Sequence, residues 1–165
     1  MPKPRARELG IPLEGTPGPL NAITDLPGIE VGYTTLIEGD SIRTGVTILH
    51  PRGKENHDPV FGGWFALNGN GELTGAAWLE EGGFLEGPIG LTNTHSVGVV
   101  RDAIITWQEQ HKALFQMWGL PVVTETADGW LNDMNGQVYN AGEPLLSEAG
   151  APDGLFAEQT GELAA

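Results

Sequence analysis

One stretch of the sequence carries apolar side chains at intervals of three and four residues, which is the pattern of a helix with one buried face. The residues on this face are Val97, Val100, Ile104, Trp107, His111, Leu114 and Trp118. Ser96 is a natural N-cap, and Gly119 with Pro121 predicts the end of the helix. The apolar stripe predicts packing against a sheet, with His111 as a hydrogen-bonded packing residue.

The remaining pattern favours short strands and turns over a helical bundle. Glycine and proline, at 25 and 12 of 165 residues, make up more than a fifth of the chain. Branched and aromatic residues predict strands in a series of short segments. These segments are 29–35, 45–50, 60–67, 89–93 and 120–126. The sequence therefore predicts one α/β (α+β) domain preceded by an extended arm over residues 1–27.

A glycine-rich string, Asn68-Gly-Asn-Gly, interrupts the strand pattern before an apolar run from Leu73 to Leu79. Asn and Gly tolerate positive φ, so the string predicts a tight hairpin turn followed by a further strand. Its glycine spacing does not fit a dinucleotide-binding loop. Glu72 is best explained as a solvated turn carboxylate.

The charge of the chain excludes several classes of partner. Eight Lys and Arg against 22 Asp and Glu give a net charge of −14, which repels nucleic acid and anionic membrane surfaces. No Lys or Arg follows Lys112, so the C-terminal third either favours a cationic ligand or stays solvated.

The chain has no cysteine, and its four histidines show no metal-ligand spacing. Thiolate chemistry is excluded, and we expect no metal and no other cofactor. The N-terminus shows no apolar core of a signal peptide or membrane span, which predicts a cytoplasmic protein.

Acidic and amide side chains gather after the last predicted strand, in Glu125-Thr-Ala-Asp-Gly-Trp-Leu-Asn-Asp-Met-Asn-Gly. A carboxylate at a strand end can bind a substrate ammonium through charge-assisted hydrogen bonds. Asp and Asn also cap turns. Composition leaves these two interpretations equal.

Several strings in order resemble the DmpA-type family of L-aminopeptidase/D-esterases and β-peptidyl aminopeptidases. They are Arg5-Ala-Arg-Glu-Leu-Gly-Ile-Pro, Gly18-Pro-Leu-Asn-Ala-Ile-Thr-Asp, Gly28-Ile-Glu-Val-Gly, Arg43-Thr-Gly-Val-Thr, Asn68-Gly-Asn-Gly-Glu-Leu-Thr-Gly, Gly87-Pro-Ile-Gly-Leu-Thr-Asn-Thr-His-Ser-Val-Gly and Leu120-Pro-Val-Val-Thr-Glu-Thr. The resemblance implies part of an αββα sandwich of the DmpA/ornithine acetyltransferase-like type. It runs from about Arg5 to Gly136, so we assign residues 1–136 to the N-terminal part of a peptidase domain and 137–165 to a divergent, acidic, flexible tail.

The resemblance also implies a chemistry. Family precursors cleave themselves into an α and a β chain, and the Ser or Thr at the new β-chain N-terminus becomes the nucleophile. They form oligomers and remove N-terminal residues from short peptides, amides or esters without a metal. This chain resembles only the N-terminal part of the α chain, so we expect a β-chain partner, a homo-oligomer in the complete enzyme and a substrate with a free amine.

Site residues follow from the same resemblance. Glu125 matches the carboxylate that receives the substrate amine, and Asn132 and Asp133 match a loop near that pocket. Ala127 stands where the family carries Tyr or Trp, which alters one pocket wall. The nucleophile and the oxyanion Asn have no counterpart, so no catalytic residue is predicted and the chain alone is expected to be inactive. A non-catalytic amine-binding or degenerate domain and a truncated gene product are the alternatives.

Overall fold

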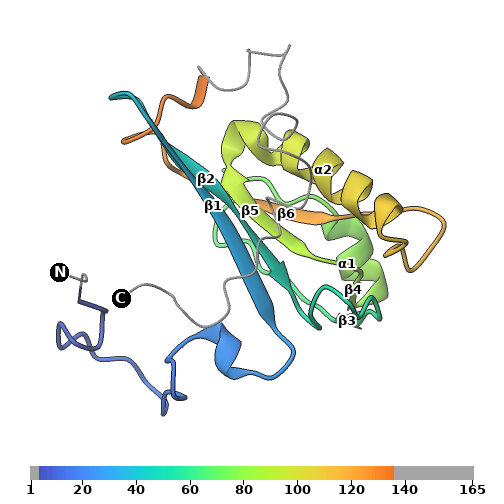
Figure 1. The fold of residues 1–165 in the computed structure, drawn as a ribbon, viewed down its shortest axis with the longest axis horizontal. Coiled ribbons are helices and arrows are strands. Elements are labelled where there is room, and N and C mark those ends of the chain that lie inside the picture. Colours follow the sequence, from blue (N-terminus) through green and yellow to red (C-terminus); the bar gives the residue numbers. More distant parts are fainter. Residues whose placement is uncertain (1–3, 136–165) are drawn as a thin grey trace.

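The computed structural model describes residues 4–135, and a four-stranded sheet forms its centre (Figure 1). The strand order is β1-β2-β5-β6, with β1 (Glu30–Glu38) antiparallel to β2 (Ile42–His50) and β2 antiparallel to β5 (Ile89–Asn93). β6 (Val122–Thr126) lies parallel to β5. A small second sheet pairs β3 (Val60–Phe61) with β4 (Phe84–Leu85).

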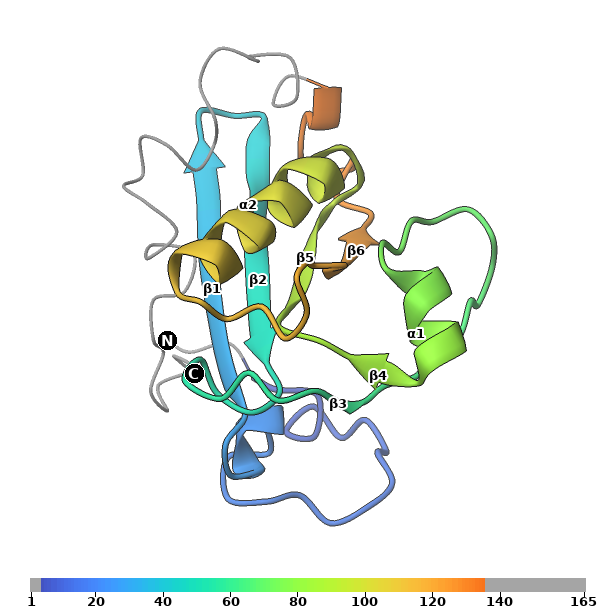
Figure 2. The same ribbon diagram turned by 90° about the vertical axis from the view of Figure 1, so that its right-hand side faces the viewer.

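Helix α2 (Val97–Gln110) connects the two parallel strands and crosses one face of the sheet (Figure 2). Its apolar stripe forms the main core, which consists of Ile48, Val97, Val100, Ile104 and Val123. Gly90 permits this close packing, because a Cβ on Gly90 would lie 2.9 Å from a methyl group of Val100. The prediction that the stripe packs against a sheet is confirmed for this part of the helix.

The two ends of α2 differ from the prediction. Ser96 is the last residue of a short 3-10 helix, η2 (Thr94–Ser96), and its side chain makes no capping bond. Asn93 caps instead, because its Oδ1 accepts a hydrogen bond from the Ser96 amide at 3.0 Å. The helix ends at Gln110, well before Gly119, so Leu114 and Trp118 lie outside it.

A Schellman motif explains the early end. Lys112 takes a left-handed φ of 54°, a conformation that usually requires glycine. The Ala113 amide donates to the Gln108 carbonyl at 2.7 Å, and the Lys112 amide donates to the Glu109 carbonyl at 3.3 Å. No glycine marks this position, so the sequence pattern could not predict it.

The hairpin expected around Asn68-Gly-Asn-Gly is wrong, because the following residues form a helix, α1 (Ala76–Gly82). Left-handed glycines flank this helix at Gly75 and Gly83, and its buried side chain Leu79 packs with Leu85 and Val122 in a second core. Only Leu73 pairs as a strand, through a single antiparallel bridge to Thr124. The strand predicted over 60–67 is also shorter, since it is confined to β3.

Residues 4–27 of the predicted extended arm lie outside both sheets, but they are folded by turns and are not extended throughout. Between Pro4 and Pro27 the chain forms turns and a short 3-10 helix, η1 (Ile23–Asp25), but no strand. The segment lies beyond the end of the sheet (Figure 1). The tail predicted over 137–165 lies outside the described residues.

An exposed apolar surface follows β3. Phe65 and Leu67 are 87% and 88% exposed, and Trp64 is 43% exposed. Trp78, which lies in the run expected to form a further strand, is instead half-buried on α1 and donates its indole N–H to Glu86 at 3.2 Å. Along the run that follows β3, the exposed apolar surface therefore comprises the segment from Phe61 to Leu67.

We expect this surface to make the isolated chain associate or bind a hydrophobic dye, because contiguous exposed apolar side chains favour burial. Light scattering and dye fluorescence measure both effects, and a Phe65→Ser, Leu67→Ser double variant should reduce them. A strictly monomeric chain that binds no dye would contradict this prediction.

Candidate functional site

The carboxyl ends of the parallel strands β5 and β6 lie side by side at one end of the sheet, where the acidic loop begins. Glu125 lies in register with Thr92, and Thr126 with Asn93. The Thr126 hydroxyl donates to the Thr92 carbonyl at 3.1 Å, which holds the two strand ends together. This end carries Glu125, the residue that the sequence singles out.

A segment from Glu72 to Thr74 runs alongside β6 and fixes its outer edge. The Glu125 amide donates to the Glu72 carbonyl at 3.3 Å, and the Thr74 amide donates to the Val123 carbonyl at 2.9 Å. The Thr74 hydroxyl donates to the Pro121 carbonyl at 2.7 Å and accepts from the Val123 amide at 2.9 Å. The backbone of Glu125 is thus held on both sides.

The side chain of Glu125 is half-buried, and within residues 4–135 its carboxylate has neither a hydrogen-bond donor nor a cationic partner. A partly desolvated carboxylate with free acceptor positions favours a cationic donor. The arrangement can therefore bind an ammonium group.

The polar residues after β6 form a loop that folds back on the start of β2. Asn132 is buried and accepts a hydrogen bond from the Arg43 amide through Oδ1 at 3.1 Å. The Asp133 amide donates to the Ser41 carbonyl at 2.8 Å, while the Asp133 carboxylate accepts from the Asn135 amide at 3.1 Å. These contacts of Asn132 and Asp133 dock and turn the loop, and none of them joins Glu125.

A chain of side-chain hydrogen bonds supports this loop, and sequence reasoning missed it. Asn93 donates to the Thr44 hydroxyl at 3.1 Å, and Thr44 donates to Asp128 at 2.6 Å. The second carboxylate oxygen of Asp128 is buried and has no partner in the described part of the chain. The only signal was the polar Asn93 at the end of an apolar strand, which the sequence pattern does not connect to residues 44 and 128.

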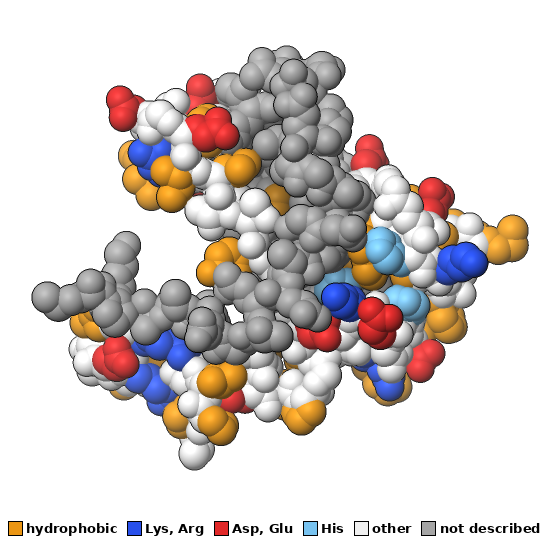
Figure 3. Space-filling view, viewed as in Figure 1, with side chains coloured by type: hydrophobic (Ala, Val, Ile, Leu, Met, Phe, Trp, Pro, Cys, Tyr) orange, Lys and Arg blue, Asp and Glu red, His pale blue; other side chains and the backbone are white. Residues whose placement is uncertain are grey.

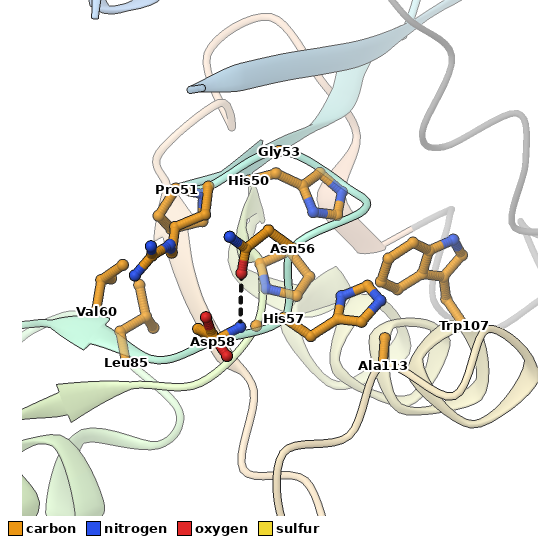
Figure 4. A pocket seen from close by; sticks show the side chains of 13 residues that line it. His50, Pro51, Gly53, Asn56, His57, Asp58, Val60, Leu85, Trp107 and Ala113 are labelled. Atoms are coloured by element: carbon orange, nitrogen blue, oxygen red, sulfur yellow. Dashed lines mark hydrogen bonds between the residues drawn. The ribbon is translucent and has the colours of Figure 1, made fainter. Parts of the chain in front are cut away.

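Three histidines surround Trp107 at the opposite end of the sheet. Two of them, His50 and His57, line a pocket together with Trp107 (Figure 4). The rings of His50 and His57 lie 5.1 and 6.3 Å from the Trp107 ring, and the His111 ring stacks on it at 4.7 Å. His111 Nδ1 lies 2.9 Å from the Trp107 carbonyl, so its predicted packing role is confirmed. Histidines gather on this side of the surface next to charged groups of both signs (Figure 3).

Burial lowers the pKa of His50 from 6.5 to about 4, with smaller contributions from the positive charges of His57 and Lys54. The neutral imidazole is therefore part of the folded packing. Within residues 4–135 no group of three or more His, Asp or Glu side chains is arranged to hold a metal ion. Over the same residues, every helix is too short or too polar to cross a membrane.

Comparison with known proteins gives matches over most of the chain. The model of peptidase family S58 matches residues 21–158. The β-peptidyl aminopeptidase BapA of Sphingosinicella microcystinivorans is 54% identical over 163 residues, which are 94% of this chain and 41% of the relative. The chain thus spans about two fifths of the length of the curated relatives it matches.

Solved structures agree with this match. The β-aminopeptidase of a Burkholderia species superposes with a TM-score of 0.72 at 52% identity, over 81% of this chain and 39% of that one. The L-aminopeptidase D-Ala-esterase/amidase of Ochrobactrum anthropi, whose structure is described as a variant of the Ntn hydrolase fold, gives a TM-score of 0.72 at 44% identity, over 81% and 40%. The predicted fold class, α/β as an incomplete part of a DmpA-type sandwich, is confirmed.

Proposed function

Because the chain belongs to peptidase family S58, we propose that it forms the amine-binding part of an aminopeptidase that removes N-terminal residues from short peptides, amides or esters. The carboxylate of Glu125, which has no partner among residues 4–135, carries the proposal. In this role it accepts hydrogen bonds from the ammonium group of the substrate and so fixes which end of a peptide enters the site.

The loop after β6 forms the border of this site in the proposal. Asn132 and Asp133 hold the loop against β2, and Ala127 is exposed immediately after the strand. A small side chain at this position leaves one side of the amine site wide. The proposal therefore includes substrates with bulky groups close to the amine.

Acyl transfer requires a nucleophile and donors for the oxyanion of the tetrahedral intermediate. We propose that a second polypeptide, produced by self-cleavage in this family, supplies both. The Oγ of its N-terminal Ser or Thr attacks the scissile carbonyl, and its own amine accepts the hydroxyl proton. The leaving amine takes that proton, and water then releases the acyl group. The complete enzyme in this proposal is an oligomer.

The 165-residue chain alone is expected to show no turnover of aminoacyl p-nitroanilides, because it carries no positioned nucleophile. Co-expression with the remaining part of a family relative, which is the rest of its α chain and its β chain, should restore hydrolysis, and a metal chelator should leave the restored rate unchanged. Hydrolysis by the highly purified chain alone would refute the proposal that another polypeptide supplies the nucleophile. Binding of free-amine ligands without restored hydrolysis would favour a non-catalytic amine-binding domain.

A further inference from the structure

We infer that Gly71 is the specificity-determining position of the amine site, an inference that rests on the proposed function. The missing side chain of Gly71 keeps the Glu125 carboxylate open to a substituted ammonium. Glu72–Thr74 runs antiparallel beside β6, so Gly71 reaches the level of Glu125. A Cβ on Gly71 would lie 3.0 Å from Oε1 of Glu125 and 3.6 Å from Cδ.

That spacing is shorter than a relaxed contact between a methyl group and an oxygen, so a side chain at position 71 displaces or covers the carboxylate. An ammonium group must approach within about 2.9 Å of a carboxylate oxygen to form its hydrogen bond. The methyl group of an alanine would compete for that space. This methyl group would also contact the first substituent on the substrate carbon that carries the ammonium group.

The turn that carries Gly71 is built independently of the carboxylate. The Asn70 amide donates to the Asn68 side-chain oxygen at 2.9 Å, which closes the turn locally. Gly69 and Gly71 both have φ outside the left-handed region, so alanine fits the backbone at either position. The requirement for glycine at position 71 therefore arises from Glu125 and not from the turn.

Gly69 provides a matched control, because a Cβ there would meet no atom within 4 Å. Gly69→Ala and Gly71→Ala make the same chemical change two residues apart on one exposed turn. Only Gly71→Ala adds an atom against the carboxylate. Circular dichroism and melting temperature should be equal for the two variants.

Access to Glu125 is measured first without a substrate. Carbodiimide-driven coupling of a small amine to Glu125, followed by peptide mass spectrometry, should proceed equally in the unchanged chain and in Gly69→Ala but more slowly in Gly71→Ala. Equal coupling in all three chains would overturn the inference. Equal slowing in both variants would also overturn it, since the cause would then be the turn.

Calorimetric titration then tests selectivity with alaninamide and the more hindered 2-aminoisobutyramide. Gly71→Ala should weaken alaninamide binding about three- to tenfold, a part of what one charge-assisted hydrogen bond contributes, and weaken the hindered amide further. An unchanged ratio of the two affinities would contradict the selectivity role. If Glu125→Gln leaves alaninamide binding unchanged while coupling still slows only in Gly71→Ala, the proposed function is wrong and Gly71 still controls access to the carboxylate.

Discussion

Replacing Glu125 by Gln is expected to weaken the binding of free-amine peptides roughly ten- to a hundredfold, because a hydrogen bond to a charged group contributes about 1.5–3 kcal/mol. Gln keeps the shape of the side chain and removes its charge. The carboxylate is half-buried and unpartnered among the described residues, so little solvent competes with the ligand. Calorimetric titration with a free-amine dipeptide measures the change.

Two controls separate the local contact from the general negative charge. Glu72→Gln removes an exposed carboxylate from the residue that pairs with Glu125 through the backbone, and it should change affinity little. An N-acetylated peptide should bind weakly to every variant. Equal binding of the free and acetylated peptides to the unchanged chain would show that Glu125 does not recognise an amine.

Acidification is expected to reduce the free energy of unfolding by about 3 kcal/mol through His50 alone, because its pKa is about 4 in the fold and 6.5 in the unfolded chain. The unfolded chain takes up a proton at His50 as the pH falls below 6.5, and the folded chain does so only near 4. The stabilisation from neutral His50 is thus complete above pH 6.5 and is lost progressively down to about pH 4.

Urea unfolding at a series of pH values tests this expectation. His50→Gln cannot titrate, so its free energy of unfolding should depend less on pH between 6.5 and 4, although the lost ring contact with Trp107 lowers its stability at neutral pH. His57, Lys54 and His111 remain in both proteins, so the difference in pH dependence between the two proteins reports on His50. His95→Gln, at an exposed histidine, is the control, and an equal change of pH dependence in it would contradict the role of His50.

Periodicity predicted the elements that pack against each other over long apolar surfaces. The stripe from Val97 to Trp107 could be predicted because α2 buries one face. The short apolar run of β6 could be predicted because successive residues of this strand are buried. Glu125 could be placed at a strand end for the same reason. The lack of a partner for its carboxylate among the described residues could not be predicted, because that depends on which cations lie nearby in the fold.

The sequence patterns did not predict local structure at positions where glycine and capping residues give no signal. The run after Asn68-Gly-Asn-Gly contains Leu73, Ala76 and Leu79, which fit a strand or a helix over so short a length. Contacts of Leu79 in the second core decide for the helix. The hydrogen bonds that join Asn93, Thr44 and Asp128 connect distant parts of the chain, and no spacing in one sequence reveals them.

The pairing of the Glu72–Thr74 segment with β6 has a consequence for the order of folding. The β1–β2 hairpin closes a short loop, whereas the bond between Thr74 and Val123 joins residues 49 positions apart. Closing a long loop costs more chain entropy and gains few contacts here, so this pairing forms after the hairpin and after α2 has docked. The wall that brings Gly71 to Glu125 is therefore assembled late and is among the first parts to open. In the proposed function, amine recognition would therefore depend on a pairing that we expect to form late.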